Sequence, residues 1–238
     1  MAGIVVIGGA NGLGGEIAVA FSGEGVGVVL ADSEAPSLPG VEFVAQDLAA
    51  VDAAAALISE AAARLGRIDA VVIAASAMES APVAEWTAAM WDRAANINLR
   101  LPFLAVQAAL PWLRASDNAS VTIISSTATL RGQPFTHAFQ ATKAGVAGLV
   151  RSLAAELGPE GVRVNAVLAG WLDSPLTRSY WAGRPDAGAE RAAVDGRIPL
   201  RRHGSAQEAA ALVRFLASPA ASYIAGALLP VDGGYAAV

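Results

Sequence analysis

Cysteine is absent from the 238-residue sequence, and histidine and lysine are nearly absent, with two copies and one copy. A chain without cysteine has no disulfide framework and no thiolate chemistry. Neither His137 nor His203 lies near a second plausible ligand at metal-site spacing, so we expect no metal. These absences exclude disulfide-rich, thiol-dependent and zinc-dependent classes of protein.

Long hydrophobic runs and clusters of basic residues are also missing. No apolar run approaches the roughly 20 residues that span a bilayer, so we expect a soluble protein with no membrane partner. The first residues, MAGIVVIGG, carry neither a basic leader nor a small-residue cleavage site, which favours cytoplasmic residence. A net charge of −5 without basic clustering predicts no nucleic-acid partner.

Strand and helix patterns alternate along the chain. Apolar or β-branched runs predict strands at 4–7, 26–30, 41–45, 69–75, 121–124, 162–167 and from 227. Helical patterns lie at 16–21, 51–65, 91–113 and 206–216, and a further helix is expected to end at about residue 157. The alternation predicts βαβ crossovers around one parallel sheet. Residues 170–204, rich in proline, glycine and arginine, are expected to form a long loop that serves as a lid.

The first strand runs into a glycine-rich turn with the pattern Gly8-x-x-x-Gly12-x-Gly14. Such a turn lets the backbone approach a pyrophosphate, whose charge is favoured at the following helix N-terminus. Alone, the pattern fits an ordinary tight turn equally well. Asp32, at the end of the next strand, favours the binding interpretation, because a carboxylate there accepts hydrogen bonds from both ribose hydroxyls and repels a 2′-phosphate. The residues therefore favour NAD over NADP.

The stretch from Ser126 to Lys143 is the candidate centre of the chemistry. Lys143 is the only lysine in a chain with fifteen arginines, and an ammonium on a flexible stem differs chemically from a guanidinium. Its distance along the chain from Ser126 is that of a Ser, Tyr, Lys site. Phe139, however, stands four residues before the lysine, where such a site has tyrosine.

These motifs, taken in order, resemble the short-chain dehydrogenase/reductase family over essentially the whole chain. The resemblance implies an α/β, Rossmann-type, doubly wound sheet of seven parallel strands in a single domain, 1–238, and a homotetramer or homodimer built through helices near 91–113 and 139–157. It implies catalytic positions at Ser126, Lys143, Asn98 and Phe139, the last at the position of the family's tyrosine. It implies NAD-binding positions at Gly8, Asn11, Gly12, Leu13, Gly14, Asp32, Asp47, Leu48, Ala74, Ala75, Lys143, Gly170, Leu172 and Ser174. A buried helical asparagine such as Asn98 is more often a structural hydrogen-bond donor than a catalytic group.

The sequence departs from the family pattern at several of these motifs. Ile7 replaces the threonine before the first glycine, and Ile73-Ala-Ala-Ser76 replaces Asn-Asn-Ala-Gly. Ala169 replaces the proline after the sixth strand, whereas Ser174 keeps a hydroxyl where the family has threonine. Side chains that brace the cofactor loops are therefore lost, although backbone contacts from Ala74 and Ala75 can survive.

Phe139 keeps the ring of the family's tyrosine but has no proton to transfer. Loss of a positioned general acid or base forfeits about 10²–10⁴ in rate. His137 falls on a different helix face, and the Ser126 hydroxyl is a poor acid, so Tyr180 in the predicted lid is the more interesting substitute, although a packing role for it is favoured. The residues Trp171, Tyr180 and Trp181 would give apolar walls, and Arg178 or Arg184 can meet an anionic group.

Three functions remain open at this stage. The first is an NAD-dependent oxidoreductase of small or apolar alcohols and ketones, slow or served by another proton donor. The second is a non-catalytic NAD-binding protein of the same fold. The third is an engineered Tyr-to-Phe inactive variant, which the departures at Ile7, Ile73 and Ala169 make less favoured. The first is preferred because Ser126 and Lys143 persist together.

Overall fold

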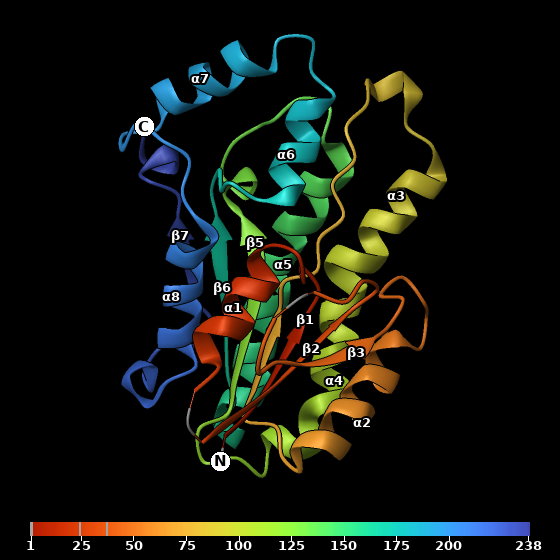
Figure 1. Ribbon diagram of the computed structural model, residues 1–238, viewed down its shortest axis with the longest axis vertical. Coiled ribbons are helices and arrows are strands. Elements are labelled where there is room, and N and C mark those ends of the chain that lie inside the picture. Colours follow the sequence, from red (N-terminus) through yellow and green to blue (C-terminus); the bar gives the residue numbers. More distant parts are fainter. Residues whose placement is uncertain (1, 24, 37) are drawn as a thin grey trace.

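The computed structural model describes residues 2–23, 25–36 and 38–238. Its centre is a seven-stranded sheet in the order β3-β2-β1-β4-β5-β6-β7, in which every neighbouring pair is parallel (Figure 1). The strands are β1 (Ala2–Ile7), β2 (Val26–Asp32), β3 (Glu42–Ala45), β4 (Ala70–Ile73), β5 (Ser120–Ser126), β6 (Arg163–Ala169) and β7 (Leu228–Val231). The strand order reverses between β1 and β4, which makes the carboxyl ends of these strands the expected ligand crevice. The predicted doubly wound α/β fold is confirmed.

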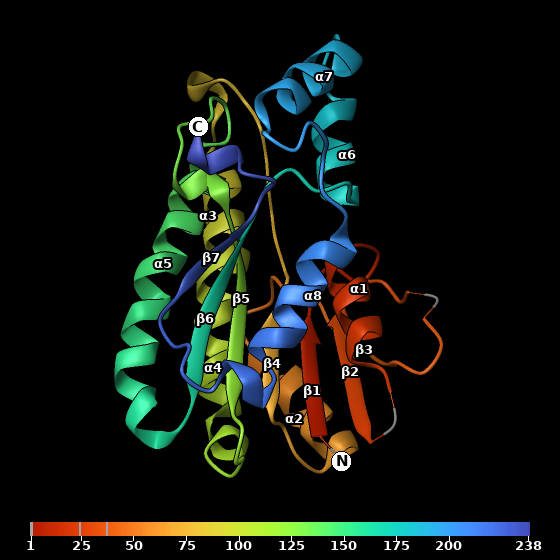
Figure 2. The same cartoon turned by 90° about the vertical axis from the view of Figure 1, so that its left-hand side faces the viewer.

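Helices cover both faces of the sheet, which is why the central strands read as continuous apolar runs. One face carries α1 (Leu13–Phe21) and α8 (Ala206–Leu216), and the other carries α2 (Ala53–Leu65), α4 (Leu101–Leu113) and α5 (His137–Leu157) (Figure 2). Each face has its own apolar core. The α8 helix begins with the predicted capping box, in which Ser205 and Glu208 bond each other's backbone N–H groups.

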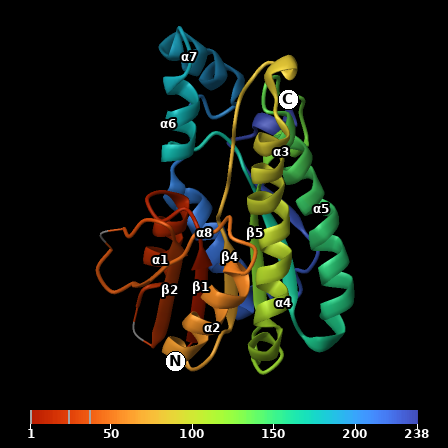
Figure 3. The same ribbon diagram turned by 90° about the vertical axis from the view of Figure 1, so that its right-hand side faces the viewer.

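The long helix predicted at 91–113 is one column made of three parts. It begins as α3 (Ala88–Ala95), passes through a π-helical turn, η2 (Asn96–Arg100), and continues as α4 (Figure 3). The α3 helix and the π turn pack against α5. Pro102 lies directly after the π turn, at the second position of α4. Pro111 lies inside α4, close to its end. Neither proline therefore interrupts this helical column.

The segment predicted as a long loop contains two helices, so that prediction was wrong in detail. They are α6 (Pro175–Ala182) and α7 (Ala187–Arg197), which stand beyond the carboxyl ends of the strands (Figure 1). Pro175 occupies the first helical position after an N-cap serine, Ser174, whose side chain accepts a hydrogen bond from the backbone of Thr177. Proline at this position starts a helix and does not break one. We call residues 175–197 the cap segment.

Short 3₁₀ turns complete the described chain. They are η1 (Val83–Glu85), η3 (Thr127–Thr129), η4 (Gly158–Glu160), η5 (Pro219–Ala221) and η6 (Tyr235–Ala237). Within the described ranges, no helix has both the length and the apolar character that a bilayer crossing requires.

Candidate active site

The glycine turn between β1 and α1 is closed too tightly for any side chain at two of its positions. Gly8 has a φ of +80°, and a Cβ added there would lie 2.4 Å from the Cα of Ala75. A Cβ on Gly14 would lie 1.9 Å from the carbonyl oxygen of Gly8. Only glycine fits either position. The turn therefore brings bare backbone, and the N-terminus of α1, to the carboxyl end of β1.

Carboxylates gather at the far end of this turn, where β2 ends. Asp32 accepts hydrogen bonds from the backbone N–H groups of Ala10, at 2.9 Å, and Ser33, at 2.7 Å. These bonds tie the end of β2 to the glycine turn. Glu34 borders the same cavity, so two acidic side chains stand where a 2′-phosphate would have to enter. Beside the end of β2, after the paired strand β3, Asp47 accepts a bond from the Ala49 N–H at 2.9 Å.

Lys143 is buried between α5 and the end of β5. Its side chain is on the inner face of α5, and its residue exposure is 2%. The ammonium donates to the carbonyl oxygen of Ile124 at 2.9 Å, and the Ser125 hydroxyl donates to the Lys143 carbonyl, also at 2.9 Å. Burial disfavours the charged form and lowers the pKa of Lys143 to about 7. The strand and the helix therefore hold an amine that can change its charge near neutral pH.

Phe139 lies one helical turn before this lysine and faces the same cavity. Its residue exposure is 7%, and the Lys143 ammonium is 5.8 Å from the centroid of its ring. Ser126 ends β5 and also borders the cavity, and its hydroxyl oxygen accepts a hydrogen bond from the Ala128 N–H at 3.1 Å. Its own proton stays available to a ligand. The predicted serine, phenylalanine and lysine thus border one space.

Asn98 has a different environment from the other predicted catalytic residues. It lies in the π turn, and its amide bonds both the N–H and the carbonyl of Ala77, at 2.8 and 2.9 Å, and the hydroxyl of Thr142 at 3.0 Å. The side chain therefore joins the chain after β4 to α5, next to Lys143. Asn98 does not border the cavity, which matches a structural hydrogen-bonding role.

One continuous cavity of about 820 Å³ joins these regions. It is bordered by the glycine turn, the ends of β2, β4, β5 and β6, and the cap segment. Every predicted NAD-binding residue borders it except Gly14, whose place is inside the turn. The predicted residues that border it are Gly8, Asn11, Gly12, Leu13, Asp32, Asp47, Leu48, Ala74, Ala75, Lys143, Gly170, Leu172 and Ser174. A cavity of this size accommodates a dinucleotide and a small substrate together.

The wall also contains a buried polar atom with no partner in the described part of the chain. Ser76, after β4, borders the cavity, yet its hydroxyl oxygen is buried and makes no hydrogen bond. A buried hydroxyl without a partner is costly. The glycine turn and the cavity beside it fit a dinucleotide such as NAD.

The aromatic and arginine side chains in and near the cap segment differ in whether they border the cavity. Tyr180, Trp181 and Arg184 border the cavity, whereas Arg178 borders a separate depression and pairs with Asp173 at 3.2 Å. Trp181 stacks on the neighbouring Trp171, with centroids 5.0 Å apart. The predicted apolar walls are therefore present, and one of the two candidate arginines faces the site.

His137 begins α5 and faces away from the cavity. Its imidazole contacts Trp86, with ring centroids 5.8 Å apart. This position agrees with its exclusion as a proton donor. Residues 131–134 and Tyr235 also border the cavity, although no motif predicted them. Residues 131–134 lie between Ser126 and Lys143 and could have been found, whereas no local pattern singles out Tyr235.

Comparison with known proteins places the chain in a family. Residues 8–236 match the family model described as enoyl-(acyl carrier protein) reductase. The chain is 37% identical over 245 residues to cis-4-hydroxycyclohexanecarboxylate dehydrogenase of Sinomonas cyclohexanicum, covering 98% of this chain and 96% of that protein. It is 30% identical over 238 residues to the NAD(+)-dependent 2-dehydro-3-deoxy-L-rhamnonate dehydrogenase of a Sphingomonas species, covering 97% and 93%.

A solved structure agrees with these sequence matches. The ligand-free aldohexose dehydrogenase of Thermoplasma acidophilum superposes with a TM-score of 0.93 at 28% identity, over 100% of this chain and 95% of that one. The chain belongs to the short-chain dehydrogenase/reductase family. The relatives named here are dehydrogenases, and the aldohexose dehydrogenase shares the fold described above.

Proposed function

We propose that this chain is an NAD(H)-dependent oxidoreductase that interconverts a small or apolar alcohol and its ketone, with proton transfer that is impaired or that uses another donor. The observation that carries the proposal is the single cavity that the glycine turn, Asp32, Ser126 and Lys143 all border. NAD, when bound, accepts or supplies the hydride. The relatives' names support this class of reaction, and the rhamnonate dehydrogenase supports NAD as the cofactor.

Each of the chain's own groups has a defined task in this proposal. The Ser126 hydroxyl donates a hydrogen bond to the substrate oxygen and orients the carbonyl. The Lys143 amine, held against Ile124, binds the nicotinamide ribose hydroxyls. Asn98 keeps the start of α5 against the chain after β4 and so positions Lys143. Phe139 supplies an apolar surface but no proton.

A second candidate function is favoured by one specific feature, Phe139. A protein that binds NAD without turning over a substrate needs the glycine turn and Asp32 but no proton donor. In that case the chain would be a regulatory or scaffold subunit of the same fold. The retained buried lysine argues for the enzyme, because a buried amine is costly to keep without a use.

The cofactor assignment gives the first prediction. The wild-type protein is expected to bind NADH at least about tenfold more tightly than NADPH, because Asp32 and Glu34 repel a 2′-phosphate. Asp32→Asn is expected to weaken NADH binding about tenfold and to narrow the difference between the two cofactors. Titrations followed by tryptophan fluorescence or calorimetry measure both constants.

A matched substitution controls for the loss of charge. Asp117→Asn removes an exposed carboxylate in the turn before β5, at the opposite end of that strand from Ser126 and the cavity, and should leave both constants unchanged. Turnover of NADH is then followed with a panel of small ketones, and we expect it to be weak. Equal or tighter binding of NADPH would contradict the assignment of NAD. Failure to bind either nucleotide would contradict both candidate functions, the enzyme and the non-catalytic binding protein.

A further inference from the structure

Arg184 is held in place between aromatic rings on the cavity wall. Its guanidinium lies 4.6 Å from the centroid of Tyr180 and 5.6 Å from that of Phe135. One terminal nitrogen, Nη2, donates to the Tyr180 hydroxyl at 2.5 Å. The side chain is only 20% exposed. The cation is therefore fixed and partly desolvated, whereas an ordinary surface arginine moves freely in water.

The charge of Arg184 is only loosely compensated. Glu190 approaches its Nε to 3.8 Å, which is too long for a hydrogen bond, and Nη1 makes no hydrogen bond to the described residues. By contrast, Arg202 makes two hydrogen bonds to Glu208, at 2.7 and 2.9 Å. Arg184 thus keeps donors that a ligand can use, and the nearby Glu190 favours a singly charged anion over a doubly charged one.

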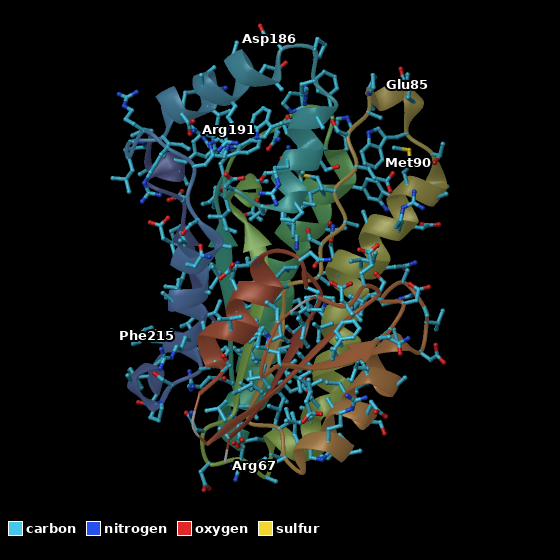
Figure 4. The ribbon with its side chains drawn as sticks, in the orientation of Figure 1. Arg67, Glu85, Met90, Asp186, Arg191 and Phe215 are labelled. Atoms are coloured by element: carbon cyan, nitrogen blue, oxygen red, sulfur yellow. The ribbon has the colours of Figure 1, made fainter. Side chains whose placement is uncertain are left out.

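Other arginines on the cavity wall are occupied or exposed. Arg131 donates to the backbone carbonyl oxygens of Tyr235 and Val238. Arg197 is exposed, and its Nε donates to the Ala193 carbonyl at 3.4 Å. Figure 4 marks another arginine of the cap segment, Arg191, which pairs with Asp173 at 3.5 Å and borders the separate depression. Arg184 is the cation best placed to meet a ligand in the cavity.

The surroundings of Arg184 are apolar. Trp171 stacks on Trp181, and Tyr180 packs against both, with ring centroids 5.5 and 5.0 Å apart. Phe139 and Pro134 border the same cavity. A ligand that fills this space needs an apolar body with one anionic group at its edge. Carboxylate is the anion whose planar geometry matches a guanidinium fork.

We propose that Arg184 anchors the carboxylate of the substrate, and that the substrate is a hydroxy or oxo acid with an apolar body between the reacting carbon and the carboxylate. This inference rests on the proposed function, because the reacting carbon is placed by Ser126 and Lys143. Tyr180 acts as a positioning residue that holds the guanidinium. Glu190 competes with the substrate for the same cation.

A pair of probes that differ in charge alone tests the anchor. We use 4-oxocyclohexanecarboxylate and its neutral carboxamide, and measure their dissociation constants by calorimetry in the NADH-saturated protein. The wild type is expected to prefer the acid at least tenfold. Arg184→Gln is expected to weaken acid binding by about 10- to 100-fold and leave the amide unchanged, the range for a hydrogen bond to a charged group. Glu190→Gln is expected to tighten acid binding several-fold.

The control is another arginine of the cap segment. Arg178→Gln removes a cation that borders the separate depression, so both probes should bind as in the wild type. Equal binding of acid and amide by the wild type, or equal weakening of both by Arg184→Gln, would overturn the anchor. Loss of acid preference with NADH binding intact leaves the proposed function standing. If NADH does not bind, the same titrations without cofactor still decide the role of Arg184.

Discussion

Phe139→Tyr is expected to raise the rate of ketone reduction by about 10²–10⁴-fold, the effect of restoring a positioned general acid. This corresponds to roughly 3–5 kcal/mol of activation barrier. The ring of Phe139 borders the cavity, so an added hydroxyl can face the substrate oxygen. Lys143 stands one helical turn away, and its positive charge would lower the pKa of the new phenol. Single-turnover oxidation of NADH with a saturating ketone measures the change.

Two further substitutions test whether the protein lacks a proton donor or uses Tyr180 in place of the missing phenol. Phe139→Leu removes the ring without adding a proton and should give no increase. Tyr180→Phe removes the phenol of the cap segment that borders the same cavity. If it abolishes the residual wild-type turnover at saturating ketone while the affinity for the ketone is unchanged, proton transfer runs through Tyr180. A Phe139→Tyr variant that binds NADH normally but is no faster on any substrate would show that the missing phenol is not the limiting defect.

The stability of the folded chain is expected to rise with pH between about 7 and 10.5, because of Lys143. The lysine has a pKa of about 7 when folded and an ordinary value of 10.5 when unfolded. In this window the unfolded chain binds a proton that the folded chain does not, so raising the pH favours the folded state. Between pH 7 and 9.5 the free energy of unfolding should increase by about 3 kcal/mol. Urea denaturation at several pH values, without cofactor, measures it.

Lys143→Met removes the titrating group and keeps an apolar stem of similar length. Its free energy of unfolding should stay nearly constant over the same pH range, and at pH 7 it should approach or exceed that of the wild type. A parallel slope in both proteins would show that another group causes the dependence. A flat wild-type profile would mean that the lysine stays charged in the folded state and that water reaches it.

The fold was predictable because its signals are local and repeated. Parallel strands buried on both faces appear as apolar runs such as Val121–Ile124, and the capping box at Ser205 marks the start of a helix. The cap segment was harder. Its prolines and glycines suggested a loop, but Pro175 stands at the one helical position where proline is favourable. The π turn around Asn98 had no sequence signal, because it depends on bonds to Ala77 and Thr142 from other elements.

The site was predictable in its residues but not in its energetics. Spacing brought Ser126, Phe139 and Lys143 together, since a strand end and the next helix meet at the edge of the sheet. The burial that lowers the pKa of Lys143 depends on tertiary packing, which no spacing reveals. Which of Arg178 and Arg184 borders the cavity likewise depends on how α6 and the residues after it are placed against the sheet. Nothing in the sequence separates two arginines in the same helical region.

The burial of Lys143 has a practical consequence for chemical labelling. It is the chain's one side-chain amine, and only 2% of the residue is accessible. An amine-reactive ester can therefore reach it only by entering the cavity or when the contact between β5 and α5 opens locally, so acylation should be slow. Mass spectrometry measures the extent of acylation at this one residue. Bound NADH should slow the labelling, which gives a measure of cofactor occupancy that needs no turnover.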